Sequence, residues 1–271
     1  MRIANYRANP NLYFSSRKKK IRMGDDIVRK TKHEFPALSP SYSDDYWLCL
    51  RTPRHSNLGR NLNIFTDKLS IPLYECRIRY GFRQEVLKDV LAELKTIKEY
   101  GVANCAEFAE LVEAMLLANN YTNSKLANVM LQLNIYDKLT GDKIYKYTCP
   151  YDHIIVLTSL DDEENSKEEI VLDGWIGKAM SISEAKREYF TLLAKQAESQ
   201  IVSDGLASYN LFLDSTQENH DTATLDDIDY TIKIFFEESK KSYLRKEFEK
   251  NPEKVRDLLR ANYPSLILKN N

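Results

Sequence analysis

Apolar residues recur at helical spacing in the segment that begins at residue 105. Phe108, Ala109, Val112, Met115 and Leu116 follow one another at intervals that place them on one face of an α-helix. The pattern predicts a helix that begins at Cys105 and ends near Asn119-Asn120. A similar pattern from Val86 to Ile97 predicts a helix that ends shortly before it.

The middle of the chain carries the periodicity of β-strands. Apolar and more polar residues alternate from Val129 to Tyr136, which predicts a half-buried strand, and residues 139–142 turn the chain into a second strand near 143–148. Two further apolar runs, 153–158 and 169–173, predict strands that are separated by an acidic loop. These segments together predict an α+β fold with an antiparallel sheet.

The two flanks have weaker patterns. Residues 1–45 are polar and predict an irregular N-terminal arm, and the basic run at 17–22 is interpreted as a solvated part of it. Residues 203–224 predict a loop-rich passage. Ile228, Ile232, Phe235 and Phe236 have helical spacing and predict a long helix over 228–250, and Asn251-Pro252 predicts the start of another.

Composition narrows the class of protein. The chain has 271 residues, 43% of them hydrophobic, and a net charge of −1, so it can bury a core and has no global field that attracts nucleic acid. No apolar run is long enough for a membrane span, and no hydrophobic signal follows Met1. We expect a cytoplasmic protein, or one exported by a route that needs no such signal.

The four cysteines are sparse and form no C-x-x-C pair, which favours a reducing compartment. Cys149 and His153 are four positions apart with Pro150 between them, and no cluster with metal-ligand spacing exists. We therefore expect neither a metal nor another cofactor.

Cys105 stands where a nucleophilic cysteine is expected. The free N–H groups at a helix start stabilise a thiolate and can donate to the oxyanion of a tetrahedral intermediate. Glu107 and Glu110 would oppose this effect if they pointed inward, so a base close to the thiol is needed. Among the four histidines, His153 alone begins an apolar strand that can hold it rigidly.

Asp173 is expected to orient the His153 imidazole by a hydrogen bond from the ring to its carboxylate. If 153–159 and 169–174 pair about a turn centred near Glu163, His153 and Asp173 stand directly opposite each other and their side chains can hydrogen-bond. Each residue also has a purely structural interpretation. Cys105 can be a small buried residue, His153 a packed strand residue, and Asp173 the turn residue before Gly174.

At these residues the chain resembles the papain-like and transglutaminase-like cysteine enzymes, and most of all the compact versions used by bacterial effectors. Residues 104–109 open a helix with the cysteine, 152–156 open a strand with the histidine, and 171–175 end one with the aspartate. Ala106 and Gly174 stand where a Gly and a Pro are usual in those proteins. The resemblance covers about residues 85–180.

The resemblance implies a helix bearing Cys105 packed on an antiparallel sheet bearing His153 and Asp173. The patterns of the flanks predict a polar arm over 1–45 and a helical C-terminal extension over 201–271. Between them the resemblance implies a papain-like/transglutaminase-like catalytic domain over 46–200. The glutamine that completes the oxyanion hole in papain-type peptidases is absent at the usual spacing, because the nearest upstream glutamine is Gln84. Asn104 is the substitute, and Trp175 is expected to wall the site.

The function expected is therefore cysteine-dependent acyl transfer on amide bonds of a protein substrate, of the glutamine deamidase or transglutaminase type. The substrate is expected to be a protein, such as a host protein modified by a virulence effector in the host cytosol. One alternative is a cysteine peptidase with the same triad. Another is a non-catalytic binding module on the same scaffold.

Overall fold

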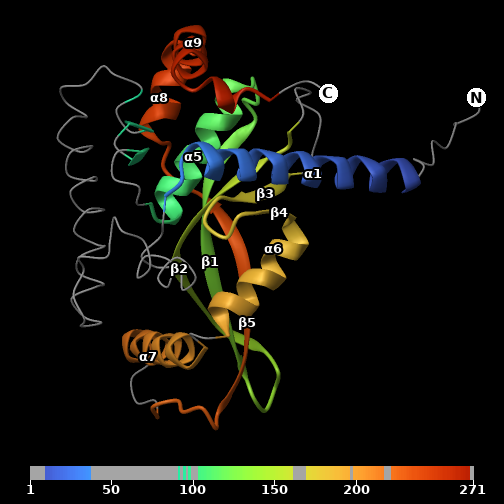
Figure 1. Ribbon diagram of the computed structural model, residues 1–271. Helices are drawn as coiled ribbons and strands as arrows, with labels where there is room; N and C mark the ends of the chain where they lie inside the picture. The colour runs from blue at the N-terminus through green and yellow to red at the C-terminus, as the bar shows by residue number, and fades with distance from the viewer. Residues whose placement is uncertain are drawn as a thin grey trace, which may run out of the picture. The chain divides into compact units, whose positions relative to one another are not determined.

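The computed structural model describes residues 10–37, 91, 94, 95, 97, 98, 103–160, 169–195, 198–216 and 221–268, with the backbone alone at 10–16, 150–152 and 193. The fold is α+β with an antiparallel sheet (Figure 1), as the sequence predicts. The helices are α1 (Pro10–Glu34), α5 (Cys105–Ala118), α6 (Ile182–Tyr189), α7 (Glu198–Thr216), α8 (Tyr243–Lys250) and α9 (Pro252–Asn262), with a π-helix η1 (Phe190–Ala194) and a 3₁₀ turn η2 (Pro264–Leu266). The strands are β1 (Ser124–Asp137), β2 (Lys143–Thr158), β3 (Ile170–Asp173), β4 (Lys178–Ser181) and β5 (Ile228–Glu238).

The strands follow the order β4-β3-β2-β1-β5. The chain forms two compact units, each built from separate segments. Unit 1 comprises 1–126, 154–181 and 240–271, and unit 2 comprises 127–153 and 182–239. The boundary between the units falls within β1 and within β2, so both strands contribute residues to each unit.

The core of unit 1 lies between two helices and the short strands β3 and β4. Helices α1 and α5 both contact β3, and α1 also contacts β4. Ile27, Phe108 and Leu172 are fully buried in this core. The predicted packing of the Cys105 helix on the sheet strand that bears Asp173 is therefore present in unit 1.

Gly24 sets how closely α1 approaches the sheet. A Cβ atom at this position would lie 2.6 Å from Leu172 Cδ2 and 2.7 Å from the Cβ of Ala179, closer than carbon atoms pack. The next residue reinforces this approach, because Asp25 Oδ1 accepts a hydrogen bond of 2.7 Å from the backbone N–H of Ala179. A side chain at position 24 would force the helix away from the strands.

A buried ion pair joins α5 to α8. Glu113 is 1% exposed, and its carboxylate accepts from Arg245 Nε at 2.9 Å and from the Ser242 hydroxyl at 2.6 Å. The other guanidinium nitrogens of Arg245 donate to the carbonyl oxygens of Thr122 and Ser124. Because both charges are satisfied by several partners, the network fixes α8 and the start of β1 against α5.

Unit 2 is a three-strand region of β2, β1 and β5 with α7 packed on it. In β1 and β5, Leu133 pairs with Ile232 and Ile135 with Tyr230. Gly205 of α7 is the point of closest approach, because a Cβ there would lie 2.3 Å from Leu133 Cδ2. The hydroxyl of Tyr145 on β2 is 2.8 Å from Ser208 Oγ on the same helix.

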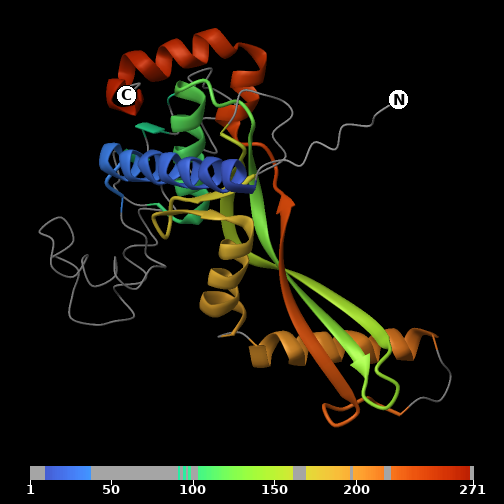
Figure 2. The same cartoon turned by 90° about the vertical axis from the view of Figure 1, so that its right-hand side faces the viewer.

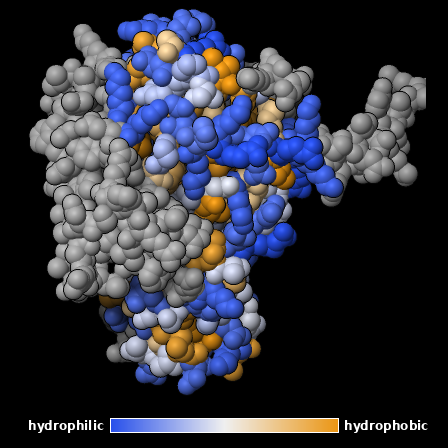
Figure 3. All heavy atoms as spheres, in the orientation of Figure 1, coloured by the Kyte–Doolittle hydropathy of each residue, from blue (hydrophilic) through white to orange (hydrophobic). Residues whose placement is uncertain are grey.

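Among the described residues, the exposed large hydrophobic side chains are concentrated on unit 2. Of the large hydrophobic residues that the structure describes as exposed, only Ile267 belongs to unit 1. Hydrophobic side chains gather over α7 (Figure 3), where Leu211 is 69% exposed and Phe212 45% exposed, and Leu225 is 57% exposed just before β5. Within the described residues, no helix is both long enough and apolar enough to cross a membrane.

Several sequence predictions are confirmed. Helix α5 begins at Cys105 and ends at Ala118, β1 contains the predicted strand 129–136, and β3 ends at Asp173. Helix α9 begins at Pro252 with Asn251 as its N-cap, whose side chain accepts from the backbone N–H of Lys254. The strands predicted near 143–148 and 153–158 form a single strand, β2.

Three predictions for the flanks are wrong. The supposed irregular arm over 1–45 contains the helix α1, which buries Ile27 and Val28. The supposed loop over 203–224 is helical as far as Thr216. The supposed helix from residue 228 is the strand β5 up to Glu238, so the C-terminal region over 201–271 is not purely helical.

We predict that Arg245→Ala lowers the free energy of unfolding by about 3–5 kcal/mol, because Glu113 would keep a buried charge without its cation. Urea denaturation of the full chain measures this loss. The control is Lys241→Ala, which removes the exposed ion pair with Glu249 and should cost less than about 1 kcal/mol. Equal losses in the two variants would contradict the role given to the buried pair.

Candidate functional site

Cys105 is the first residue of α5, and Asn104 is the N-cap. Asn104 has an extended backbone, and its carbonyl accepts the first helical hydrogen bond from the N–H of Phe108 at 2.9 Å. Glu107 Oε2 accepts from the backbone N–H of Asn104 at 3.0 Å. This capping arrangement explains why the helix begins here, and it gives the Glu107 carboxylate a structural role.

The exposure of α5 changes sharply along its length. Cys105 is partly exposed, whereas every residue from Leu111 to Ala118 is buried. The first-turn N–H groups of a helix lack intrahelical partners and favour negative charge nearby. The thiol therefore lies at the electropositive end of a helix whose remainder is anchored in the core of unit 1.

Asp173 is fully buried at the end of β3 and organises the turn that follows. Its Oδ1 accepts from the backbone N–H groups of Trp175 at 2.9 Å and Ile176 at 3.1 Å. Its carbonyl accepts from the N–H of Gly177 at 2.9 Å. The turn function expected of an Asp before Gly is thus present, and it holds this carboxylate in one orientation.

Gly174 connects the Asp173 turn to the Cys105 helix. A Cβ at Gly174 would lie 2.9 Å from the carbonyl oxygen of Phe108 and 3.0 Å from Val112 Cγ2. The turn is therefore seated directly on the first two turns of α5. Within unit 1, the structure thus brings the elements that carry Cys105 and Asp173 into direct contact.

Lys32 is a residue of this region that the sequence interpretation missed. From α1, its Nζ donates to the carbonyl oxygen of Trp175 at 3.3 Å and lies 5.2 Å from the centre of the Phe108 ring. Trp175 itself is half-buried against the core of unit 1. Lys32 thus contacts both the Asp173 turn and the first turn of α5. No sequence signal marked it, because it follows a basic run that suggested a solvated arm.

His153 belongs to unit 2 and is 2% exposed. Its ring meets the ring of Tyr189 edge-on at 5.3 Å between centroids, and Tyr189 in turn meets Phe236 at 6.1 Å. His153 therefore has a fixed place in an aromatic cluster of this unit. The other histidine that the structure describes, His33, is exposed, and His55 and His220 lie outside the described residues.

The predicted register between β2 and β3 is wrong by two positions. Val156 pairs with Leu172 and Leu157 with Val171, and continuing this register places Asp173 across from Ile155 rather than His153. A shift of two residues preserves the face on which a side chain of β2 lies. The direct opposition of His153 and Asp173 that the sequence suggested is therefore wrong.

The other described cysteine differs from Cys105. Cys149 of β2 is also partly exposed, but burial and the nearby Asp204 carboxylate raise the pKa of its thiol. Cys49 and Cys76 lie outside the described residues. In the described part of the chain, no three His, Cys, Asp or Glu side chains converge in a way that could hold a metal ion.

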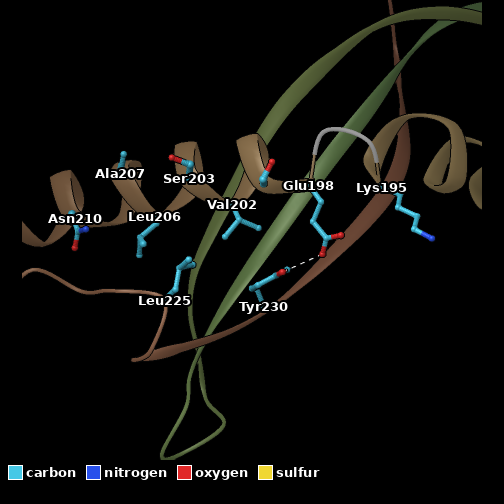
Figure 4. Close-up of a pocket in the computed structure, with 10 residues that line it drawn as sticks. Lys195, Glu198, Val202, Ser203, Leu206, Ala207, Asn210, Leu225 and Tyr230 are labelled. Atoms are coloured by element: carbon cyan, nitrogen blue, oxygen red, sulfur yellow. Dashed lines mark hydrogen bonds between the residues drawn. The ribbon is translucent and has the colours of Figure 1, made fainter.

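Unit 2 has a groove of about 850 Å³ between α7 and the start of β5 (Figure 4). Val202 and Leu206 point from α7 toward Leu225 and Tyr230, which form the opposite wall. The Tyr230 hydroxyl donates to Glu198 Oε1 at 3.1 Å, and this bond together with desolvation raises the pKa of Tyr230. The groove is mainly apolar, with Glu198 and Lys195 at one end and Asn210 at the other (Figure 4), and its residues were not singled out by the sequence.

Comparisons with protein-family models, with curated proteins and with solved structures gave no match to this chain.

Proposed function

We propose that this chain is a cysteine-dependent acyl-transfer enzyme with Cys105 as nucleophile, His153 as general base and Asp173 as orienter. The observation that carries the proposal is the position of Cys105. It is a partly exposed thiol at the first residue of a capped helix that is buried from Leu111 to Ala118. The start of a helix favours negative charge nearby and supplies backbone N–H donors for an oxyanion.

In the proposed reaction the Cys105 thiol gives its proton to His153, and the resulting thiolate attacks the carbonyl carbon of an amide while the C=O π electron pair moves onto the oxygen. The oxyanion accepts hydrogen bonds from N–H groups at the start of α5, with Asn104 and Trp175 beside it. Protonated His153 gives its proton to the leaving nitrogen, the C–N bond breaks and a thioester remains. Water then yields an acid, or an acceptor amine yields a new amide, with His153 taking the proton from the attacking group.

The substrate proposed is a glutamine carboxamide on a protein, which gives deamidation with water and transglutamination with an amine. The preference over peptide cleavage rests on the lack of a glutamine shortly before Cys105. A papain-like/transglutaminase-like core, a reducing compartment and a host protein as substrate belong to the same proposal. The packing of α5 on β3 supports such a core.

A non-catalytic role on the same scaffold is the second candidate. It is favoured by the structural roles already visible for two of the three residues. Asp173 holds a turn through Oδ1, and His153 packs against Tyr189. In that case the chain would act as a binding module, and the thiol of Cys105 would have no special reactivity.

We predict that iodoacetamide labels Cys105 faster than Cys149 near neutral pH. Both thiols are partly exposed, but the raised pKa of Cys149 leaves less of it as thiolate, whereas Cys105 lies at a helix start that favours negative charge. Peptide mass spectrometry after short labelling times measures both rates. Cys149→Ala should leave the rate at Cys105 unchanged, and equal rates at the two sites would count against an activated nucleophile.

A further prediction separates catalysis from packing at Cys105 and His153. Cys105→Ala should abolish turnover, measured as ammonia release and as a mass increase of about 1 Da on a glutamine-rich denatured protein. His153→Phe retains an aromatic ring beside Tyr189 but has no base, so the rate should fall about 10³-fold or more. Both proteins should remain folded.

Asp173 allows the sharpest comparison. Asp173→Asn keeps an oxygen that can accept from Trp175 and Ile176, so the turn should survive, but an amide favours the wrong imidazole tautomer and the rate should fall about 10²–10⁴-fold. Asp173→Ala removes the turn bonds and should also lower the melting temperature. If Asp173→Asn were as active as the unmodified chain, Asp173 would be a turn residue only.

A further inference from the structure

Strand β5 lies at one edge of the described sheet and belongs to unit 2. It stands last in the strand order and pairs with β1 over Ile228–Glu238 (Figure 2). Among the residues that the structure describes, no strand pairs with its other side. An edge strand carries a row of backbone N–H and C=O groups that can pair with another strand, so the composition of this edge decides what it accepts.

The exposed part of the edge is short and is centred on Thr231. Asp229, Tyr230, Thr231 and Lys233 are exposed and Ile232 is half-buried, whereas Ile228 and Ile234 on either side are buried. The two charged residues stand two positions before and two positions after Thr231. This arrangement of one acid and one base about a central residue is complementary to its own antiparallel copy.

We propose that β5 pairs with β5 of a second copy of this chain, antiparallel, with Thr231 on the twofold axis. In this register Asp229 of each copy stands opposite Lys233 of the other, and Tyr230 opposite Ile232. Because a twofold interface repeats every contact, two ion pairs and two apolar pairs form at once. The three strands of unit 2 then continue directly into the strands of the second copy.

The charges of Asp229 and Lys233 support a second copy as the occupant. Among the ion pairs of the described residues, none involves Asp229 or Lys233. A strand of unrelated sequence would have to carry a base opposite Asp229 and an acid opposite Lys233. A second β5 in the antiparallel orientation carries both at the required positions. Sheet pairing also adds Tyr230, which is 39% exposed, to a buried interface.

One other charge-matched register exists and is less favourable. Pairing Lys233 with Glu237 would place Phe235 on the axis and Ile232 opposite Glu238, so an apolar side chain would face a carboxylate. It would also use the half-buried residues 234–236 rather than the exposed ones. The register about Thr231 pairs charge with charge and apolar with apolar throughout the exposed stretch.

The test is a set of charge reversals on the full chain, followed by sedimentation velocity over a dilution series at low ionic strength, where exposed ion pairs are screened least. The unmodified chain should be a dimer that dissociates on dilution. Asp229→Lys and Lys233→Glu each create two like-charge pairs and should raise the dimer dissociation constant about tenfold or more. The double variant Asp229→Lys/Lys233→Glu should restore it.

Mixing the two single variants provides a second readout that loss of folding cannot mimic. In the mixed dimer the unmodified Lys233 of one copy faces the unmodified Asp229 of the other, and the introduced lysine faces the introduced glutamate. The two weakened proteins should therefore associate with each other at the concentration at which the unmodified chain does. Glu237→Lys is the matched control on the same strand and should leave the dissociation constant unchanged.

Three outcomes would overturn the proposal. The chain could remain monomeric throughout the series, in which case Lys233 protects the edge against pairing. The double variant could fail to restore a dimer that the single reversals had broken. Glu237→Lys could break the dimer while Asp229→Lys does not, which would move the pairing to the other register.

Discussion

The close packing of two helices on the short strand β3 is the constraint on which unit 1 depends. Strand β3 has only four residues, all of them buried. A helix can cover it tightly only where a residue at the contact, in the helix or in the strand, has no side chain. Gly24 provides this on α1, and Gly174 provides it where the strand ends against α5. These two contacts set the distance between each helix and β3.

The position of the proposed nucleophile follows from this packing. Since the Asp173 turn is seated on Phe108 and Val112, the first turn of α5 cannot shift along its axis without losing that contact. Lys32 adds a hydrogen bond from α1 to the same turn. Further along the helix, the buried Glu113 carboxylate holds Arg245 and Ser242. Cys105 is thus located by contacts along the length of α5, although it is itself partly exposed.

The sequence predicted the elements whose patterns are unambiguous. Helix α5 has both a polar N-cap and an apolar face, and β3 is a run of apolar residues that ends in Asp-Gly. Strand β5 was mistaken for a helix because Ile228, Ile232, Phe235 and Phe236 fit helical spacing. The same segment also alternates through Tyr230 and Ile234, and pairing with β1 decides between the two periods.

Other errors arise from contacts that a single sequence does not display. The polar first helix is stabilised by contacts with β3 and β4 that lie far away in the chain, and α7 contains Gly205, which weakens the helix locally but allows close packing on Leu133. The predicted register between β2 and β3 was wrong by two residues because the loop between two strands need not be symmetric about its centre. Lys32 was missed because its partners, Phe108 and Trp175, belong to distant segments of the chain. The contacts of the Asp173 turn with α5 also join distant segments, so the sequence pattern did not predict them. A single sequence therefore shows where Cys105 and Asp173 stand in their own elements, whereas the packing that holds those elements together becomes visible only in the fold.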